Sequence, residues 1–117
     1  MRLTSEFWVA ALVRRVNDSG AFAALGNKGA AEAGAIFIKF RNKDGSYDLF
    51  GPAPQLAYDE RKPDERIFVL VKTGVAEMEV DDELQRQMRW DRDLWIVEIE
   101  DYRAARDDLF PVTDLEY

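Results

Sequence analysis

The hydrophobic and polar positions of this 117-residue chain repeat with two different periods, and the change between them is clearest near residue 93. Before that point Val80, Leu84 and Met88 recur every four residues, so they share one stripe of an amphipathic helix that Asp81 or Asp82 can cap. After it the period is two, the period of a β-strand. One strand face carries Trp95, Val97 and Ile99, and the other carries Leu94, Ile96, Glu98 and Glu100. The pattern predicts a buried helix followed almost directly by a buried strand whose second face is partly solvated.

The beginning of the chain predicts another amphipathic helix. Thr4 or Ser5 can cap its first turn, and the sequence Asn-Asp-Ser-Gly at residues 17–20 is typical of its end. Two neighbouring rows of apolar side chains run along it: Trp8, Leu12 and Val16, and beside them Val9 and Val13. Such a wide apolar surface indicates that the helix packs against a sheet.

Four strands are expected between the two helices, over residues 21–25, 33–41, 46–50 and 66–72. The sequence Asn-Lys-Asp-Gly at residues 42–45 predicts a hairpin turn, and Thr73 with Gly74 is expected to end the fourth strand. In the second strand Ile36, Ile38 and Phe40 share one face, and Phe37, Lys39 and Arg41 share the other.

The order of elements is therefore helix, four strands, helix, strand. Because short connections favour antiparallel pairing of neighbours, we expect an α+β fold: a single mainly antiparallel sheet of about five strands with two helices packed on one face. Residues 1–117 form a single domain in this interpretation. Residues 102–117 have no clean period. Either Leu109, Phe110, Pro111 and Val112 fold back as a clasp, or this end of the chain is a mobile tail.

The amino-acid composition excludes several classes of catalysis and metal binding but does not identify a reaction. The chain has no cysteine and no histidine, which excludes thiolate and imidazole catalysis and the usual ligands of zinc, copper and haem. No cofactor is expected. A hydrophobic fraction of 47% is ample for a core.

Charge is uneven along the chain, whose net charge is −7. Residues 1–50 carry seven Lys and Arg against five Asp and Glu, and residues 51–117 carry nine against eighteen. An acidic domain repels phosphate backbones, so we expect no nucleic-acid partner. No apolar run approaches the roughly 20 residues of a membrane span, and we expect a cytoplasmic protein without membrane contact.

Four stretches of the sequence resemble a small bacterial family known as domain of unknown function 1491. They are RLTSEFWV at residues 2–9 with Arg14 and Arg15, GAAEAGAIFI at 29–38, PAPQ at 52–55 with Asp59 and Glu60, and DRDLWIVEIE at 91–100. The family pattern has proline between the two aspartates of the last stretch, where this chain has Arg92. The resemblance implies a cytoplasmic protein, from an alphaproteobacterium, and carries no activity, cofactor or catalytic residue.

Two hypotheses for function remain. The first is a non-catalytic protein-interaction module, binding a protein partner or a second copy through a mixed-charge sheet face with exposed aromatic side chains. Its candidate residues are Phe37, Lys39, Arg41, Trp90, Glu98 and Glu100.

The alternative is a small hydrolase that uses Asp and Glu alone, with or without Mg²⁺ or Ca²⁺. Glu98 and Glu100 stand two apart on one strand face, so their carboxylates lie roughly 6 to 7 Å apart, near the lower limit for water-activating carboxylate pairs. Asp91, Asp93 and Asp101 are the acidic residues that could hold a hard cation. The competing structural interpretation is a solvated face on which Glu98 and Glu100 pair with Lys39 and Arg41.

Overall fold

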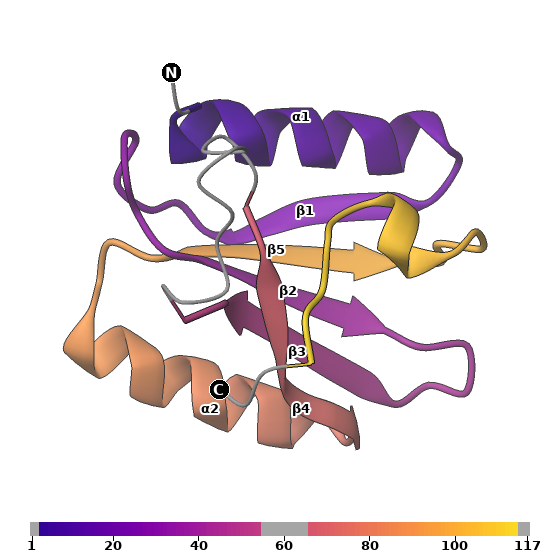
Figure 1. Ribbon diagram of the computed structural model, residues 1–117. Helices are drawn as coiled ribbons and strands as arrows, with labels where there is room; N and C mark the ends of the chain where they lie inside the picture. Colours follow the sequence, from indigo (N-terminus) through magenta and orange to yellow (C-terminus); the bar gives the residue numbers. More distant parts are fainter. Residues whose placement is uncertain (1–2, 55–65, 115–117) are drawn as a thin grey trace.

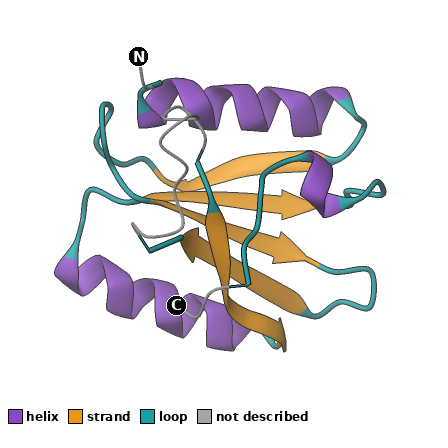
Figure 2. Cartoon of the chain, viewed as in Figure 1, coloured by secondary structure: helices purple, strands orange, loops and turns teal. Residues whose placement is uncertain are grey.

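The computed structural model describes residues 3–54 and 66–114, and shows a five-stranded sheet between two helices (Figures 1 and 2). The elements are α1 (Ser5–Asp18), β1 (Phe22–Asn27), β2 (Ile36–Arg41), β3 (Tyr47–Pro52), β4 (Phe68–Val75), α2 (Glu77–Trp90), β5 (Trp95–Glu100) and the 3₁₀ helix η2 (Arg106–Asp108). The α+β class is confirmed. Gln55, Asp59 and Glu60, three residues of the family resemblance, lie outside the described residues.

The sheet is mixed rather than antiparallel. Its strand order is β1-β5-β2-β3-β4, so β5 lies between β1 and β2 and runs parallel to β2. The other three pairings are antiparallel. The expected pairing of chain neighbours is wrong for β1 and β2 because β5 is apolar on both sides at its start, and a strand of that kind is stable at a central position. β1 carries alanine and glycine and takes the edge.

The two helices lie on opposite faces of the sheet, which corrects the expectation that both pack on one face. Val9, Leu12 and Val16 of α1 join a core with Ile38 and Val97. Val80 and Leu84 of α2 join a second core with the strand residues of opposite parity: Phe37, Leu49 and Ile96. Successive strand side chains point to opposite faces, so two separate apolar clusters require one helix on each side.

The predicted helix cap is confirmed for α1, whereas the start of α2 and the end of β4 differ from the predicted bounds. Thr4 caps α1 by accepting from the Phe7 backbone, as expected. By contrast α2 begins at Glu77, four residues before the acidic pair expected to cap it, and Ala76 is its N-cap. β4 continues through Thr73 and Gly74, since Gly74 adopts φ +64° where the β3–β4 register shifts.

The C-terminal segment, residues 102–114, folds back onto the α1 side of the sheet. Phe110 is buried and contacts the rings of Phe50 and Phe68 at 5.1 and 5.2 Å. The Phe68 amide donates to the Pro111 carbonyl at 2.9 Å, and the Thr113 amide donates to the Phe68 carbonyl at 2.8 Å. This segment therefore covers the β3–β4 half of the face whose other half lies beneath α1.

Candidate functional site

The sheet has two faces and two halves, and described elements cover three of these four quadrants. α1 packs over β1 and β5 on one face, and the C-terminal segment packs over β3 and β4 on the same face. On the opposite face α2 packs over β3 and β4 (Figure 1). Within residues 3–54 and 66–114, neither helix packs over β1 and the second half of β5 on that second face, although Ile96 at the start of β5 is buried in the core beneath α2. We name this surface the open quadrant; it comprises Phe22, Ala24, Arg41, Glu98 and Glu100.

Strand register sets the order of the side chains in the open quadrant. Phe22 stands opposite Glu100, and Ala24 stands opposite Glu98, across the antiparallel β1–β5 pair. The Glu98 carboxylate reaches over Gly26, where a β-carbon would come within 2.6 Å of its Oε2. Small residues on β1 therefore leave room for the longer side chains of β5. Phe22 stands out from this row, with 55% of its surface exposed.

The two glutamates of the open quadrant form no ion pair within the described part of the chain. The expected pairing of Glu98 with Lys39 is wrong, although the two residues are register partners on β5 and β2. Lys39 instead donates to Glu77 at 2.7 Å and to Asp81 at 2.8 Å, both on α2. Glu98 and Glu100 are thus half-buried carboxylates beside an exposed aromatic ring.

Lys39 is enclosed beneath the first turns of α2. It is 5% exposed, and its ammonium lies 5.2 Å from the centre of the Tyr47 ring. Burial would lower the pKa of Lys39, but hydrogen bonds to Asp81 and Glu77 outweigh burial and hold that pKa above its ordinary value of 10.5. The hydrogen bond from Lys39 also lowers the pKa of Glu77. This cluster ties α2 to the sheet and leaves Lys39 inaccessible.

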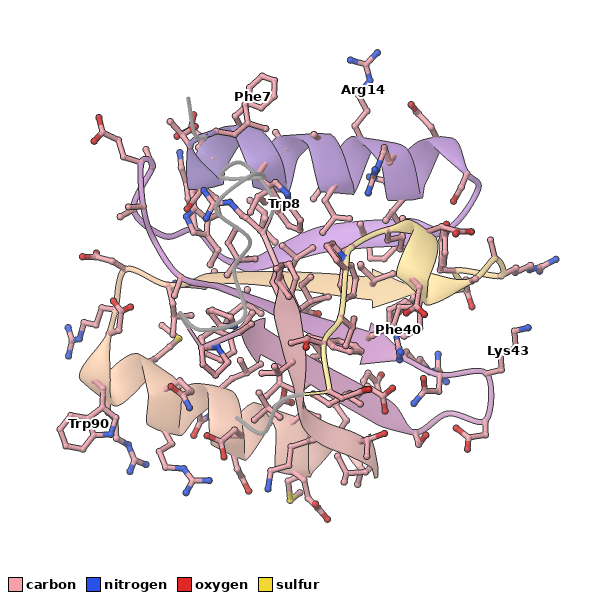
Figure 3. All side chains as sticks on the ribbon, in the orientation of Figure 1. Phe7, Trp8, Arg14, Phe40, Lys43 and Trp90 are labelled. Carbon is pink, nitrogen blue, oxygen red and sulfur yellow. The ribbon has the colours of Figure 1, made fainter. Side chains whose placement is uncertain are left out.

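The remaining predicted aromatic residues fall in different places. Phe37 is 3% exposed in the α2-side core, so the expectation that it is an exposed contact is wrong. Trp90 is 87% exposed at the last residue of α2 and points away from the molecule in Figure 3. It lies near the start of β5, whereas Glu100 lies at the other end of that strand. The structure brings Arg41, Glu98 and Glu100 together and leaves Trp90 apart.

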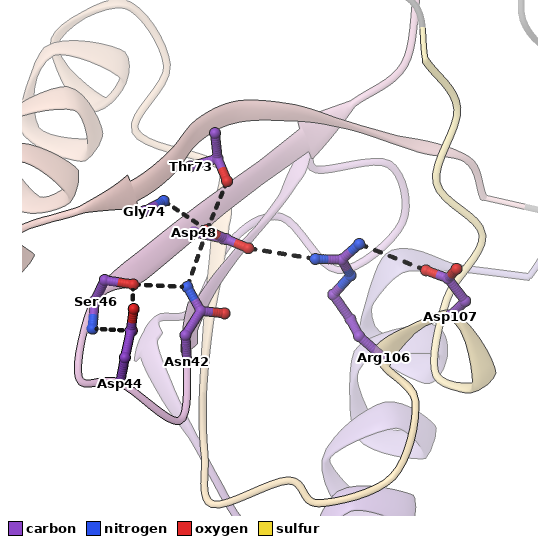
Figure 4. Close-up of polar contacts among 8 residues, drawn as sticks. All are labelled: Asn42, Asp44, Ser46, Asp48, Thr73, Gly74, Arg106 and Asp107. Carbon is purple, nitrogen blue, oxygen red and sulfur yellow. Dashed lines mark hydrogen bonds and ion pairs between the residues drawn. The ribbon is translucent and has the colours of Figure 1, made fainter.

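The sequence analysis did not single out Asp48, a buried carboxylate that accepts several hydrogen bonds at the end of the sheet where the β2–β3 hairpin lies (Figure 4). Asp48 Oδ1 accepts hydrogen bonds from the Asn42 amide at 3.0 Å, the Thr73 hydroxyl at 3.0 Å and the Gly74 backbone at 2.8 Å. Its Oδ2 pairs with Arg106 at 3.3 Å. These bonds join the β2–β3 hairpin, β4 and η2, so Asp48 is a structural residue.

The three aspartates considered as ligands of a hard cation, Asp91, Asp93 and Asp101, do not converge. Asp91 and Asp93 precede β5 and Asp101 follows it, and a strand of this length spans roughly 20 Å. Asp91 Oδ1 accepts from the Asp93 backbone at 2.9 Å, as in a local turn. Within the described ranges, no three acidic side chains are placed to hold a metal ion. No observation favours the hydrolase over the interaction module.

Sequence reasoning missed Phe22 and Ala24. Residues 21–25 form a short apolar run, and the partner strand needed to assign its faces was unknown. Phe22, Ala23 and Ala24 are all apolar, so no contrast in the sequence separates the buried side of this strand from its open side.

These features define a class: a small α+β domain with a mixed five-stranded sheet, one helix on each face and one uncovered quadrant. The sequence profile of the family described as "Protein of unknown function (DUF1491)" matches residues 3–107. The chain belongs to this family.

Three solved structures support this assignment. A protein from A. tumefaciens, solved in solution, has a TM-score of 0.81 and 44% identity, over 99% of this chain and 98% of that one. A DUF1491 family protein from Caulobacter crescentus CB15, solved by crystallography, has a TM-score of 0.78 and 34% identity over 97% and 100% of the two chains. An NMR structure of a DUF1491 family protein from the same organism gives 0.76 and 33%, over 97% and 99%. Among proteins of curated function, none matches this chain.

Neither α1 nor α2 is long and apolar enough to cross a membrane, and the same holds for any helix in the described ranges.

Proposed function

We propose that the protein is a non-catalytic protein-interaction module whose binding surface is the open quadrant and the adjoining edge of β1. The observation that carries this proposal is Phe22. It is a large aromatic side chain, more than half exposed, next to two carboxylates that form no ion pair with any described residue. Aromatic side chains surrounded by charge are common anchors of protein interfaces.

The position of β1 favours an extended partner segment. β1 is an edge strand, and its outer side pairs with no described strand. An open edge offers backbone donors and acceptors to an added strand, and side chains on alternate faces then supply specificity. Leu25, which is 47% exposed on the other face of β1, gives a second apolar contact to such a strand.

Charge indicates the chemistry of the partner. Glu98 and Glu100 outnumber Arg41 in the open quadrant, and the whole chain carries −7. A second copy of the chain would bring like charges together, whereas a basic segment would be attracted. We therefore favour a partner segment with an apolar residue against Phe22 and Lys or Arg toward the two glutamates.

Affinity capture from a lysate of the native host, with three immobilised forms of the protein, tests this function. The wild type is compared with Phe22→Ser and with Phe7→Ser, which alters a phenylalanine on α1 that is exposed to a similar extent. We expect a basic protein to be retained by the wild type and by Phe7→Ser but lost with Phe22→Ser, and released by added salt because the contact is partly ionic.

Hydrogen exchange of the complex then locates the contact, with slower exchange expected in β1. Retention that is equal for Phe22→Ser and Phe7→Ser would contradict the proposal. Sedimentation at micromolar concentration identifies the other possible occupant: a dimer that dissociates in Phe22→Ser would show that the surface binds a second copy instead.

A further inference from the structure

A pocket of about 360 Å³ lies at one end of the sheet, next to the open quadrant, with which it shares Arg41. β2 and β5 are parallel neighbours, so the residues that follow them meet at the same edge. The lining residues are Arg41, Asn42, Lys43, Asp101, Tyr102 and Arg103. Crevices beyond the carboxyl ends of parallel strands are frequent sites of ligand binding, and this volume lies within the range of small-molecule sites, about 300 to 1,000 Å³.

The charge of this pocket is opposite to that of the protein. Three of its residues, Arg41, Lys43 and Arg103, are cationic, and one, Asp101, is anionic, whereas the chain as a whole carries −7. In the described part of the chain none of the three cations forms an ion pair, although Arg14, Lys39, Arg86 and Arg106 all do. Three unpaired cations around one hollow repel each other, so an anion bound there would be stabilised.

The chain segments that follow both strands set the positions of the residues that carry these cations. Asp101 adopts φ 60°, in the left-handed region that few residues other than glycine occupy, and it turns the chain directly after β5. Tyr102 is half-buried against the α1-side core, which anchors the segment that carries Arg103. On the other strand, Asn42 is fixed by its bonds to Asp48 and Ser46, and Lys43 lies at the tip of the β2–β3 hairpin (Figure 3).

We propose that this pocket binds a small organic phosphate, with Arg41, Lys43 and Arg103 holding the phosphate group. Arginine and lysine donate charge-assisted hydrogen bonds to phosphate oxygens. The Asp101 carboxylate would repel a bare phosphate, but it accepts a hydrogen bond from a hydroxyl group of the organic part. The ligand class is therefore a hydroxylated phosphate monoester rather than inorganic phosphate.

NMR titrations of the ¹⁵N-labelled protein with glycerol 3-phosphate and with inorganic phosphate, at constant ionic strength, test this site. We expect saturable shifts of amide signals at residues 41–43 and 101–103, and tighter binding of glycerol 3-phosphate. Arg103→Gln should weaken binding about tenfold, because a hydrogen bond to a charged group contributes about 1.5 kcal/mol or more. The matched control is Arg14→Gln, which removes an exposed arginine on the outer side of α1 and should leave binding unchanged.

Asp101→Asn separates the two parts of the proposed ligand. It should strengthen binding of inorganic phosphate, because a repulsive charge is removed, and reduce the preference for glycerol 3-phosphate. Shifts that do not saturate, or equal weakening by Arg103→Gln and Arg14→Gln, would overturn the proposal. Amide signals outside the pocket report whether each variant keeps its fold. Neither titration involves the partner protein, so this site and the proposed function succeed or fail separately.

Discussion

The burial of Lys39 changes the role that was predicted for the strand face on which it lies with Arg41. Its position on a strand face with Arg41 suggested a surface charge, but α2 covers it and supplies Glu77 and Asp81 as partners. The charge of Lys39 therefore stabilises the packing of α2 on the sheet, and only the neighbouring β1–β5 surface stays open to a partner.

The Lys39–Glu77 pair predicts a specific dependence of stability on acid. The hydrogen bond from Lys39 lowers the pKa of Glu77 from its ordinary value of 4.5 in the folded protein. The stabilisation is fully present above pH 4.5 and is lost as the pH falls through the lower folded value. Urea unfolding at pH 7, 4 and 3 should show a smaller decrease in the free energy of unfolding for Glu77→Gln than for the wild type. An identical decrease in both would contradict the role of this pair.

Asp48 allows a prediction about buried charge. Asp48→Asn keeps the shape of the side chain but removes the charge that pairs with Arg106 and replaces one acceptor oxygen by a donor. We expect a decrease of about 2 to 4 kcal/mol in the free energy of unfolding, measured by urea denaturation. The matched control is Asp107→Asn, since the Asp107 side chain is 75% exposed in its pair with the same arginine, and it should change stability by less than about 0.5 kcal/mol. Equal effects of the two substitutions would contradict the assignment.

At the scale of elements, the C-terminal segment acts as a third cover of the sheet. Phe110→Ala removes a fully buried ring from contact with Phe50 and Phe68. We expect it to reduce the free energy of unfolding by about 3 to 5 kcal/mol, whereas Phe7→Ala on the exposed side of α1 should change it by less than about 0.5 kcal/mol. A small effect of Phe110→Ala in chemical denaturation would show that the segment contributes little to the core.

Individual elements were predictable from the sequence where the apolar period was clean. The stripe of Val80, Leu84 and Met88 faces the α2-side core, and Trp95, Val97 and Ile99 face the other core, as expected. The start of α2 was not predictable from capping residues, because Ala76 takes the N-cap position without a side-chain hydrogen bond. Local signals fix the type of an element better than its ends.

At the scale of the molecule, strand order could not be obtained from the sequence. Periodicity shows which side chains share a face but not which strand lies beside it, so the insertion of β5 between β1 and β2 left no local signal. The candidate site depended on that insertion. Glu98, Glu100 and Arg41 were found from their alternation, whereas Phe22 and Ala24 needed the β1–β5 register. Phe37 and Lys39 were misplaced because the position of α2 was unknown.

The sharing of strands between the two cores predicts cooperative unfolding. β2, β3 and β5 contribute side chains to both clusters, so neither core can lose its strands without disrupting the other. We expect a single thermal transition in which tryptophan fluorescence and far-ultraviolet circular dichroism change together. The calorimetric enthalpy should be about 80 kcal/mol near 60 °C and equal to the van't Hoff value. Two separate transitions would contradict a single folding unit.

The open quadrant is the claim on which the proposed function depends, and two neighbouring alanines test it directly. Ala23 and Ala24 follow each other on β1 and point to opposite faces, one beneath α1 and the other into the open quadrant. Relaxation of their methyl signals by a soluble paramagnetic reagent measures how accessible each face is. We predict strong relaxation of the Ala24 methyl and weak relaxation of the Ala23 methyl. Equal protection of both methyl groups would show that the β1–β5 surface is covered, and would contradict the account.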